Sequence, residues 1–313
     1  MSNSDKKAPE THFTITMPFW RGVRYAFETA FAYIIFGFFW ILPLHAASAV
    51  GGFLGRNIGP HLGISRKAHN NISLAFPDKG EEEKQKIVSD MWDNLGRTIA
   101  EYPHLKKIGQ IAEVVNKDLL LDISEKKHAS IVFSGHIANW EVLPTTSKQQ
   151  GNFESHLAYR KPNNPWVDNL LRTARSCGAV GHIPKSRKGA LEMTRLMKNN
   201  GILGILIDQK YNEGISVPFL GHDAMTMPFV AQLGLKYDCA VYPGRIERIK
   251  GPKFRFTIYP AMTFEKTGDN EKDIYNAMVD IHRHLEDWIT ERPGEWLWLH
   301  QRWPKPLQTD ATA

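Results

Sequence analysis

Cysteine is nearly absent from this chain, with only Cys177 and Cys239 among 313 residues. Two thiols exclude a disulfide scaffold, a multi-thiolate zinc site and an iron–sulfur cluster, and they favour a reducing compartment for most of the chain. There is also no collagen period and no short solenoid repeat. Hydrophobic residues make up 42% and charged residues 23%, a composition that excludes a wholly disordered chain.

The signatures of several common enzyme classes are missing as well. The sequence has no G-x-S-x-G elbow, no Walker loop, no H-E-x-x-H and no G-x-G-x-x-G after a predicted strand. We therefore expect neither a metal nor a bound cofactor. Without an obvious serine or cysteine nucleophile, direct attack by a substrate hydroxyl is favoured over a covalent enzyme intermediate.

Charged residues are missing from one long segment. Residues 29–55 contain no Asp, Glu, Lys or Arg, and their centre reads AFAYIIFGFFWILPL. A bilayer span needs about 20 mostly apolar residues, and core helices are seldom apolar on every face for so long. We predict a membrane-anchor helix over residues 28–55, either spanning or lying in one leaflet, which Pro43 kinks or ends. A buried core helix is the alternative, and residues 1–27 are expected to form a polar tail.

Basic residues exceed acidic ones, with 39 Lys and Arg against 33 Asp and Glu and a net charge of +6. This excess favours an anionic partner. Lys185, Arg187 and Lys188 form one candidate basic cluster, although a solvated surface explains such a cluster equally simply. No nucleic-acid-binding motif accompanies these residues, so nucleic acid is not expected as a partner.

Beyond residue 56, the hydrophobic periodicity predicts an α/β fold. Two amphipathic helices come first, over residues 64–76 and 81–102, and the second places Ile87, Met91, Leu95 and Ile99 on one face. Strands and helices then alternate without a linker, which predicts a mixed, mostly parallel sheet covered by helices in one catalytic domain over residues 56–313. The predicted strands are 130–135, 155–160, 202–208, 239–246 and 253–260, and the predicted helices are 139–147, 165–177, 187–199, 227–237 and 271–292.

Polar side chains follow three of these strands. His136 comes directly after the first, Tyr159 and Arg160 end the second, and Asp208 and Gln209 end the third. Active groups of open α/β sheets gather at the carboxyl ends of strands. We therefore expect these residues to meet in one site.

His136 is the candidate general base, because imidazole has a pKa near neutrality and can take a proton from a hydroxyl. The turn after it can fold the Glu141 carboxylate back onto the ring, where it would hold the tautomer and stabilise the imidazolium. Backbone N–H groups near Asn139 are candidate oxyanion donors. A polar helix start, with Glu141 favouring the helix dipole, is the alternative.

The other strand ends suggest substrate contacts. Arg160 can bind a phosphate or phosphopantetheine oxyanion through its guanidinium fork, and a surface ion pair is its alternative. Asp208 either positions Arg160, contacts the acceptor or caps the strand end. Tyr159, Gln209 and Asn139 complete the candidate substrate-binding set.

The chain resembles the late acyltransferases of lipid A biosynthesis, the lauroyl/myristoyl family of Gram-negative bacteria. Beside the anchor, six motifs occur in the family's order between about residues 30 and 305. They are NISLAFP (71–77), SGHIANWE (134–141), YRKPNNP (159–165), DQKYN (208–212), VPFLG (217–221) and WLWLHQRWP (296–304).

This resemblance implies an inner-membrane O-acyltransferase whose catalytic domain faces the cytoplasm. It implies acyl carrier protein as the donor's carrier, a hydroxyl of a Kdo-lipid A precursor as the acceptor, phospholipid as a further partner, and a fold like that of the glycerol-phosphate acyltransferases. The family's H-x4-D/E motif falls on His136 and Glu141, its arginine on Arg160 and its aspartate on Asp208.

One departure is visible at the C-terminal end. The family motif His-Arg-Arg-Trp reads His300-Gln301-Arg302-Trp303 here. Of the two arginines of this motif, only Arg302 is present as a candidate substrate contact. Three alternatives stay open: an acyl-CoA-dependent acyltransferase of another glycolipid such as phosphatidylinositol mannoside, a non-catalytic membrane-tethered relative, and a tethered hydrolase.

Overall fold

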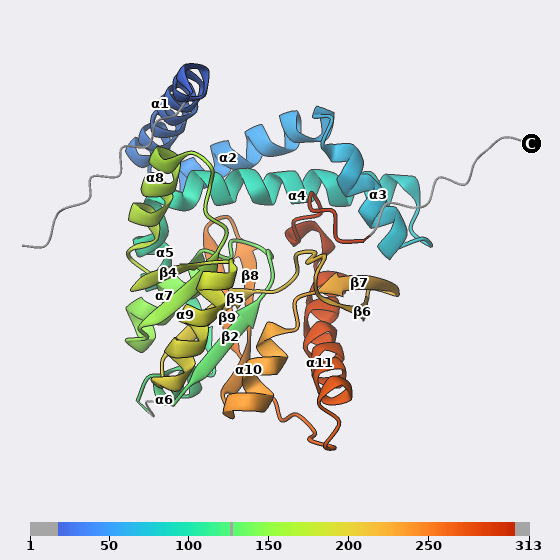
Figure 1. Ribbon diagram of the computed structural model, residues 1–313. Helices are drawn as coiled ribbons and strands as arrows, with labels where there is room; N and C mark the ends of the chain where they lie inside the picture. The colour runs from blue at the N-terminus through green and yellow to red at the C-terminus, as the bar shows by residue number, and fades with distance from the viewer. Residues whose placement is uncertain (1–17, 126–127, 304–313) are drawn as a thin grey trace, which may run out of the picture.

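A computed structural model describes residues 18–125 and 128–303, and a seven-stranded sheet forms its centre (Figure 1). The strand order is β1-β9-β8-β2-β5-β3-β4. Every neighbouring pair is parallel except β8 and β9, which form an antiparallel pair. The predicted mixed, mostly parallel sheet is confirmed. The sheet strands are β1 (Glu113–Val115), β2 (Ser130–Ser134), β3 (Ser155–Tyr159), β4 (Gly181–Pro184), β5 (Ile202–Leu206), β8 (Ala240–Lys250) and β9 (Lys253–Ile258).

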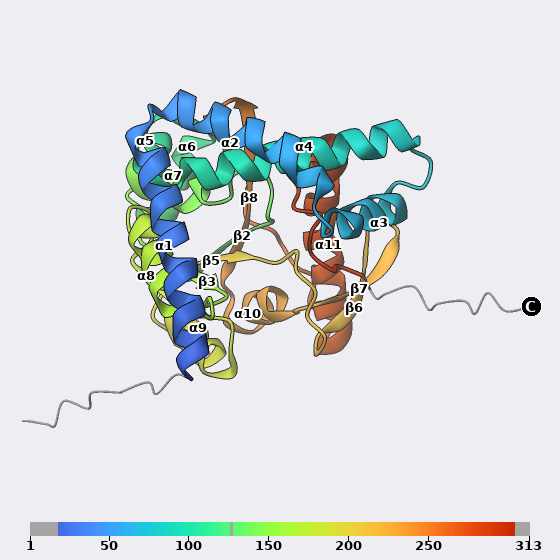
Figure 2. The ribbon, with the colours of Figure 1, turned by 90° about the horizontal axis from the view of Figure 1, so that it is seen from above.

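Helices cover both faces of the sheet, as the buried strands require. On one face, helices α5, α6 and α7 contact β9, and α7 also contacts β8. On the other face, α9 contacts β4 and β5, and α10 and α11 contact β8. Helices α2 and α4 lie side by side across one end of the sheet (Figures 1 and 2). The helices after α2 are α3 (Ser65–Ala75), α4 (Glu81–Glu101), α5 (Leu105–Ile111), α6 (Lys117–Glu125), α7 (Val142–Gly151), α8 (Pro165–Arg175), α9 (Arg187–Lys198), α10 (Phe229–Tyr237) and α11 (Asn270–Glu291).

A separate hairpin of β6 (Ile215–Phe219) and β7 (His222–Thr226) packs against α11. Its two-residue loop, Leu220 and Gly221, has φ values of 49° and 79°. Two left-handed residues in a two-residue loop define the turn whose twist matches antiparallel strands. Periodicity in the sequence did not predict this hairpin.

The segment over residues 28–55 forms two helices and not one, so the predicted bounds were wrong, but the expectation that Pro43 kinks or ends the helix is confirmed. Helix α1 covers Phe19–Ile41 and α2 covers Leu44–Ile58, and the chain turns at extended Leu42 and at Pro43. Part of the predicted polar tail belongs to α1, and the rest of it, residues 1–17, lies outside the described residues. Within the part of the chain that the structure describes, no helix has both the length and the apolarity needed to cross a membrane.

Helix α2 packs tightly along α4. A Cβ at Gly51 would lie 2.4 Å from the carbonyl oxygen of Gly96, and a Cβ at Gly55 would lie 2.1 Å from that of Trp92. Glycine is therefore required at both positions for the two backbones to approach this closely. Five residues of α2 are buried, whereas Phe53, Leu54 and Ile58 are 42–55% exposed, so the helix is buried on one side only.

Helix α1 has a different surface. Phe27, Phe31, Ile34, Phe38 and Ile41 recur at helical spacing on one side, and they are 50–76% exposed. We call these five residues the α1 stripe. The opposite side is attached to α8, where the Asn164 amide donates to the Tyr25 carbonyl at 2.9 Å. Figure 2 shows α1 along one edge of the molecule beside α8.

Helix α4 confirms the prediction of a helix but not of its buried face. Ile87 and Met91 are buried as expected, whereas Ile99 is 48% exposed. The buried side of the second half of the helix instead carries Asn94, Thr98 and Glu101. A stripe of polar residues in the interior needs partners, and those partners include Arg248 and the backbone and side chains of residues 138 and 139.

Candidate active site

The carboxyl ends of β2, β3 and β5 open into a cavity of about 230 Å³. Among the residues that the sequence predicted for the site, His136, Glu141, Tyr159, Arg160 and Gln209 all line this cavity. The expectation that the strand ends form one site is confirmed. Parallel strands bring them together because all of their carboxyl ends lie at the same edge of the sheet.

His136 is held by Asp208 from the end of β5. The Nδ1 atom of His136 lies 2.7 Å from Asp208 Oδ1, and its backbone N–H donates to Asp208 Oδ2, also at 2.7 Å. The Trp296 indole N–H donates to the same Oδ2 at 2.7 Å. Asp208 is 1% exposed. Burial raises the pKa of this carboxyl, but charge on His136 and these hydrogen bonds outweigh it and hold the pKa well below its usual range.

This contact determines the tautomer of His136. An ionised carboxylate only accepts hydrogen bonds, so Nδ1 carries the proton and Nε2 is left as the acceptor. The Gln209 amide nitrogen lies 3.4 Å from His136 Nε2 and 3.2 Å from His300 Nε2. Burial, and then the neighbouring His136, lowers the pKa of His300 to about 4, so His300 is neutral at pH 7. In the neutral ring, Nε2 is therefore the proton acceptor of His136, a residue that lines the cavity.

The predicted contact between Glu141 and His136 was wrong. The Glu141 carboxylate accepts from Arg175 Nε at 2.7 Å, Arg175 Nη2 at 2.5 Å and the Tyr102 hydroxyl at 2.7 Å. The Trp140 indole donates to it at 3.0 Å. Burial raises the pKa of Glu141, but Arg175 and these hydrogen bonds outweigh it and lower the pKa. Glu141 is thus an ionised carboxylate within a separate cluster in the cavity wall.

Asn139 supports the turn but does not line the cavity. Its side chain is fully buried, and its amide donates to Glu101 Oε2 at 2.8 Å while its Oδ1 accepts from the Glu141 backbone N–H at 3.2 Å. The backbone N–H of Ala138 donates to the Glu295 carbonyl at 2.9 Å. Two of the backbone donors near Asn139 that we considered for an oxyanion are therefore already engaged.

Arg302 lies away from the cavity, contrary to its predicted place among the substrate contacts. It is fully buried and donates to the Met225 carbonyl at 2.9 Å and to Thr226 Oγ1 at 2.6 Å. Its guanidinium also lies 4.8 Å from the Phe219 ring centroid. The residue fastens the C-terminal segment to the β6–β7 hairpin. Such a role depends on tertiary contacts, which the spacing of the motif does not reveal.

Cationic groups gather at the cavity beyond the predicted Arg160. Arg175 and Lys185 also line it, beside His182, whose pKa is lowered by burial so that its ring is neutral at pH 7. Burial lowers the pKa of Lys185, whose ammonium group donates to the Leu206 carbonyl at 2.9 Å. The basic cluster in the sequence included Lys185 without indicating this cavity. One feature of the sequence could have indicated Arg175. Asp168, Arg172 and Arg175 recur at helical spacing on α8, so these charged residues lie on the same side of the helix.

The cavity also has an apolar lining. Val132, Leu143, Phe153, Leu157 and Phe256 line it. Such a cavity, with a base and cations also in its wall, suits a molecule with one apolar and one polar end. Among residues 18–125 and 128–303, no group of three or more His, Cys, Asp or Glu side chains is placed to hold a metal ion.

Comparison with known proteins matches most of the chain to the family that the six motifs resemble. A family profile described as "Bacterial lipid A biosynthesis acyltransferase" matches residues 17–305. The curated lipid A biosynthesis lauroyltransferase of Escherichia coli (strain K12) is 22% identical over 246 residues, which cover 75% of this chain and 77% of that protein. The matched range contains every residue of the site described above.

Proposed function

The chain belongs to the bacterial lipid A biosynthesis acyltransferase family and is an O-acyltransferase, and from this premise we propose its donor, acceptor and mechanism. The donor is a fatty acyl thioester of acyl carrier protein. The acceptor is a hydroxyl of a Kdo-lipid A precursor. The reaction forms the ester and releases the carrier thiol, so neither a metal nor a cofactor enters the balance.

His136 is the proposed general base. Its Nε2 takes the proton from the acceptor hydroxyl as the oxygen attacks the thioester carbonyl, and the imidazolium then returns this proton to the departing thiolate. Asp208 holds the reactive tautomer and stabilises the imidazolium. This replaces Glu141 as the group that orients His136, and the support is the 2.7 Å separation of Nδ1 and Oδ1.

Glu141 keeps a proposed role in catalysis through Arg175. The two side chains form a bidentate ion pair with Tyr102 beside it, and such a pair fixes the guanidinium in one orientation. Arg175 lines the cavity together with Arg160 and Lys185. We propose that these cations receive the phosphate groups of the two substrates, while the apolar wall receives the acyl chain.

We place the enzyme at the cytoplasmic side of the inner membrane, lying on the surface through the α1 stripe. Exposed apolar patches of this size mark interaction sites, and an amphipathic helix can lie in the membrane interface with its apolar side inward. Arg21 and Arg24 begin the same helix and would favour anionic headgroups. A surface position would let a lipid acceptor and an aqueous carrier protein reach one cavity.

The single observation that carries the proposal is that His136, hydrogen-bonded to Asp208, lines a partly apolar cavity in a chain of this family. The test is the lipid A mass spectrum of a strain lacking the gene, complemented with wild type or with His136→Ala. We expect one secondary acyl chain to be lost and only the wild type to restore it. Unchanged lipid A in all three strains would contradict the proposed acceptor.

A further inference from the structure

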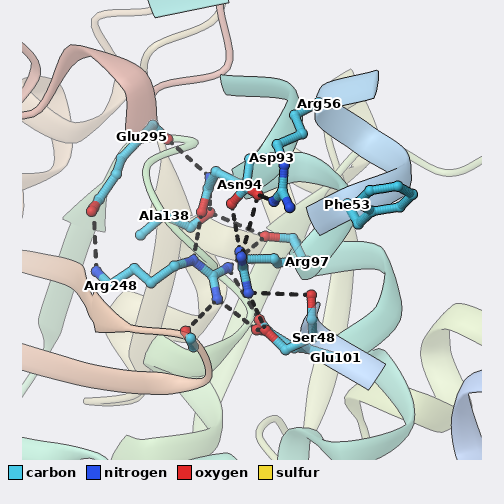
Figure 3. A network of polar contacts seen from close by, with 12 residues as sticks. Ser48, Phe53, Arg56, Asp93, Asn94, Arg97, Glu101, Ala138, Arg248 and Glu295 are labelled. Atoms are coloured by element: carbon cyan, nitrogen blue, oxygen red, sulfur yellow. Dashed lines mark hydrogen bonds and ion pairs between the residues drawn. The ribbon is translucent and has the colours of Figure 1, made fainter. Parts of the chain in front are cut away.

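Arg248 occupies the centre of a buried polar network between the sheet and α4 (Figure 3). It extends from β8, is 8% exposed, and donates to all three residues on the polar side of α4, Asn94, Thr98 and Glu101. Its Nε donates to Asn94 Oδ1 at 2.9 Å. Its Nη1 and Nη2 donate to the two carboxylate oxygens of Glu101 at 2.5 and 3.1 Å.

Two partners of Arg248, Asn94 and Glu101, hold the turn that carries the candidate catalytic residues, residues 135–141, which we call the His136 turn. Asn94 donates to the carbonyl oxygen of Ala138 at 2.9 Å. Glu101 accepts from the Asn139 amide at 2.8 Å. One guanidinium thereby fixes two adjacent residues of the turn without touching the cavity.

The His136 turn needs such support because its backbone is strained. Ala138 has a φ of 49°, a left-handed conformation that costs a non-glycine residue on the order of 1 kcal/mol or more. Its N–H and C=O groups are both used, by Glu295 and by Asn94. Such a conformation persists only where the surrounding contacts over-determine it.

A buried ion pair by itself adds little to stability, because desolvation of the two charges offsets their attraction. Glu101 is nevertheless fully buried, and its carboxylate accepts from Ser48, Asn139 and Arg248. These donors come from α2, the His136 turn and β8. The arrangement sets the position of the turn relative to the rest of the protein.

We propose that Arg248 is a positioning residue for acyl transfer, acting through Asn94 and Glu101 to hold the His136 turn in the conformation that places His136 over Asp208. The inference rests on the proposed function, because it concerns the kcat of the proposed acyl transfer. It adds residues that lie outside the cavity and outside the six motifs.

The chain offers a matched control on the same strand. Arg245 is also on β8, is also 8% exposed, and forms ion pairs with Glu247 and Glu291. Its pairs lie away from the His136 turn. Arg248→Met and Arg245→Met therefore remove equally buried charges, and only the first removes support from the turn.

The kinetic test measures kcat, KM and the melting temperature of both variants with acyl-acyl carrier protein and Kdo-lipid A precursor. We expect Arg248→Met to lower kcat at least tenfold with KM within threefold, and Arg245→Met to keep kcat within twofold. Arg248→Lys is expected to lie between Arg248→Met and wild type. Equal kcat values for the two Met variants would overturn the inference, as would a loss explained entirely by the unfolded fraction.

Hydrogen–deuterium exchange provides a second test that needs no substrate. The amides of residues 136, 138 and 141 donate to Asp208, Glu295 and Asn139, so a released turn exchanges faster. We expect at least tenfold faster exchange across 135–141 in Arg248→Met than in Arg245→Met. If Arg248→Met fails to fold, Glu101→Gln, which keeps the side-chain shape, takes its place in both tests. Equal exchange overturns the inference, whereas an inactive wild type contradicts only the proposed function.

Discussion

The Asp208 carboxylate binds His136 at two atoms, the ring Nδ1 and the backbone nitrogen, both at 2.7 Å. The two residues end neighbouring parallel strands, β2 and β5. The second oxygen of the carboxylate is also bound to Trp296. Asp208 therefore has no freedom to turn toward the substrate, and its effect on the reaction must pass through the imidazole.

Asp208→Asn should disable the base while leaving the cavity intact. An amide can donate to Nδ1 and so favours the wrong tautomer, and in a Ser-His-Asp hydrolase the same change costs about 10⁴-fold in kcat. We expect a loss of about 10³- to 10⁴-fold, with little change in KM. Steady-state transfer of a radiolabelled acyl group measures it. A loss below tenfold would remove Asp208 from the mechanism.

Glu141 and Arg175 should behave as one unit. Removing either partner leaves the other charge buried and unpaired, which typically costs about 3–5 kcal/mol. We expect Glu141→Gln and Arg175→Met each to lower both the melting temperature and the transfer rate, and the double variant to be no worse than the more damaged single one. A double-mutant cycle on rate and stability measures this coupling. Fully additive losses would show that the pair does not act together.

Acid should destabilise the fold through His282. Its Nδ1 atom contacts the Pro218 carbonyl at 2.8 Å, and Arg302 donates to Nε2 at 3.3 Å. Burial, and then the charge of Arg302, lowers the pKa of His282 from 6.5 to about 4. Because the folded pKa is depressed, this stabilisation is present above pH 6.5 and is lost as the pH falls toward 4.

The size of this effect is on the order of 3 kcal/mol. Thermal unfolding followed by circular dichroism between pH 7.5 and 4 measures it. His282→Gln removes the titrating group, so the variant should be less stable at pH 7 but should show a shallower decline with acid. Parallel declines of the two proteins would assign the acid sensitivity to other groups.

The α1 stripe should control membrane binding. Burial of one Phe side chain is worth about 1.5–3 kcal/mol, so Phe31→Ser combined with Phe38→Ser should weaken binding at least tenfold. Co-sedimentation with phosphatidylethanolamine–phosphatidylglycerol vesicles measures the change. Leu191→Ser is the control, since Leu191 is 60% exposed on α9. Equal binding of the double variant and this control would rule out the stripe as the membrane contact.

Local patterns were sufficient for the fold class and for five of the seven strands of the sheet, but they missed β1, β4 and the β6–β7 hairpin. The strand over residues 130–135 and the helix over 165–177 were predicted within two residues, because hydrophobic runs and caps act over one element. The same patterns placed His136, Arg160 and Asp208 at strand ends, and parallel pairing then brought those ends together. Fold class and the location of the cavity therefore follow from the sequence.

Partner choice within the site was decided by tertiary structure. Glu141 is five residues from His136, yet its charge is taken by Arg175 from another helix, and His136 is held by a residue 72 positions away. Arg302 resembled a substrate contact but is enclosed by the β6–β7 hairpin. Spacing along the chain cannot rank such partners, because the electrostatic attraction between two side chains depends on their separation in space and on burial.

The N-terminal segment and α4 were decided in the same way. An uncharged run predicts contact with an apolar environment but does not say which one. Here one side of α2 packs against α4 through glycine contacts, while α1 and the other side of α2 expose apolar side chains. The polar residues Asn94, Thr98 and Glu101 are buried because Arg248 and the His136 turn supply their hydrogen bonds. The sequence by itself determined the fold class, five of the seven strands of the sheet and which of these strands end in reactive groups. The tertiary structure decided which charges meet, since burial and pairing depend on neighbours that are distant along the chain.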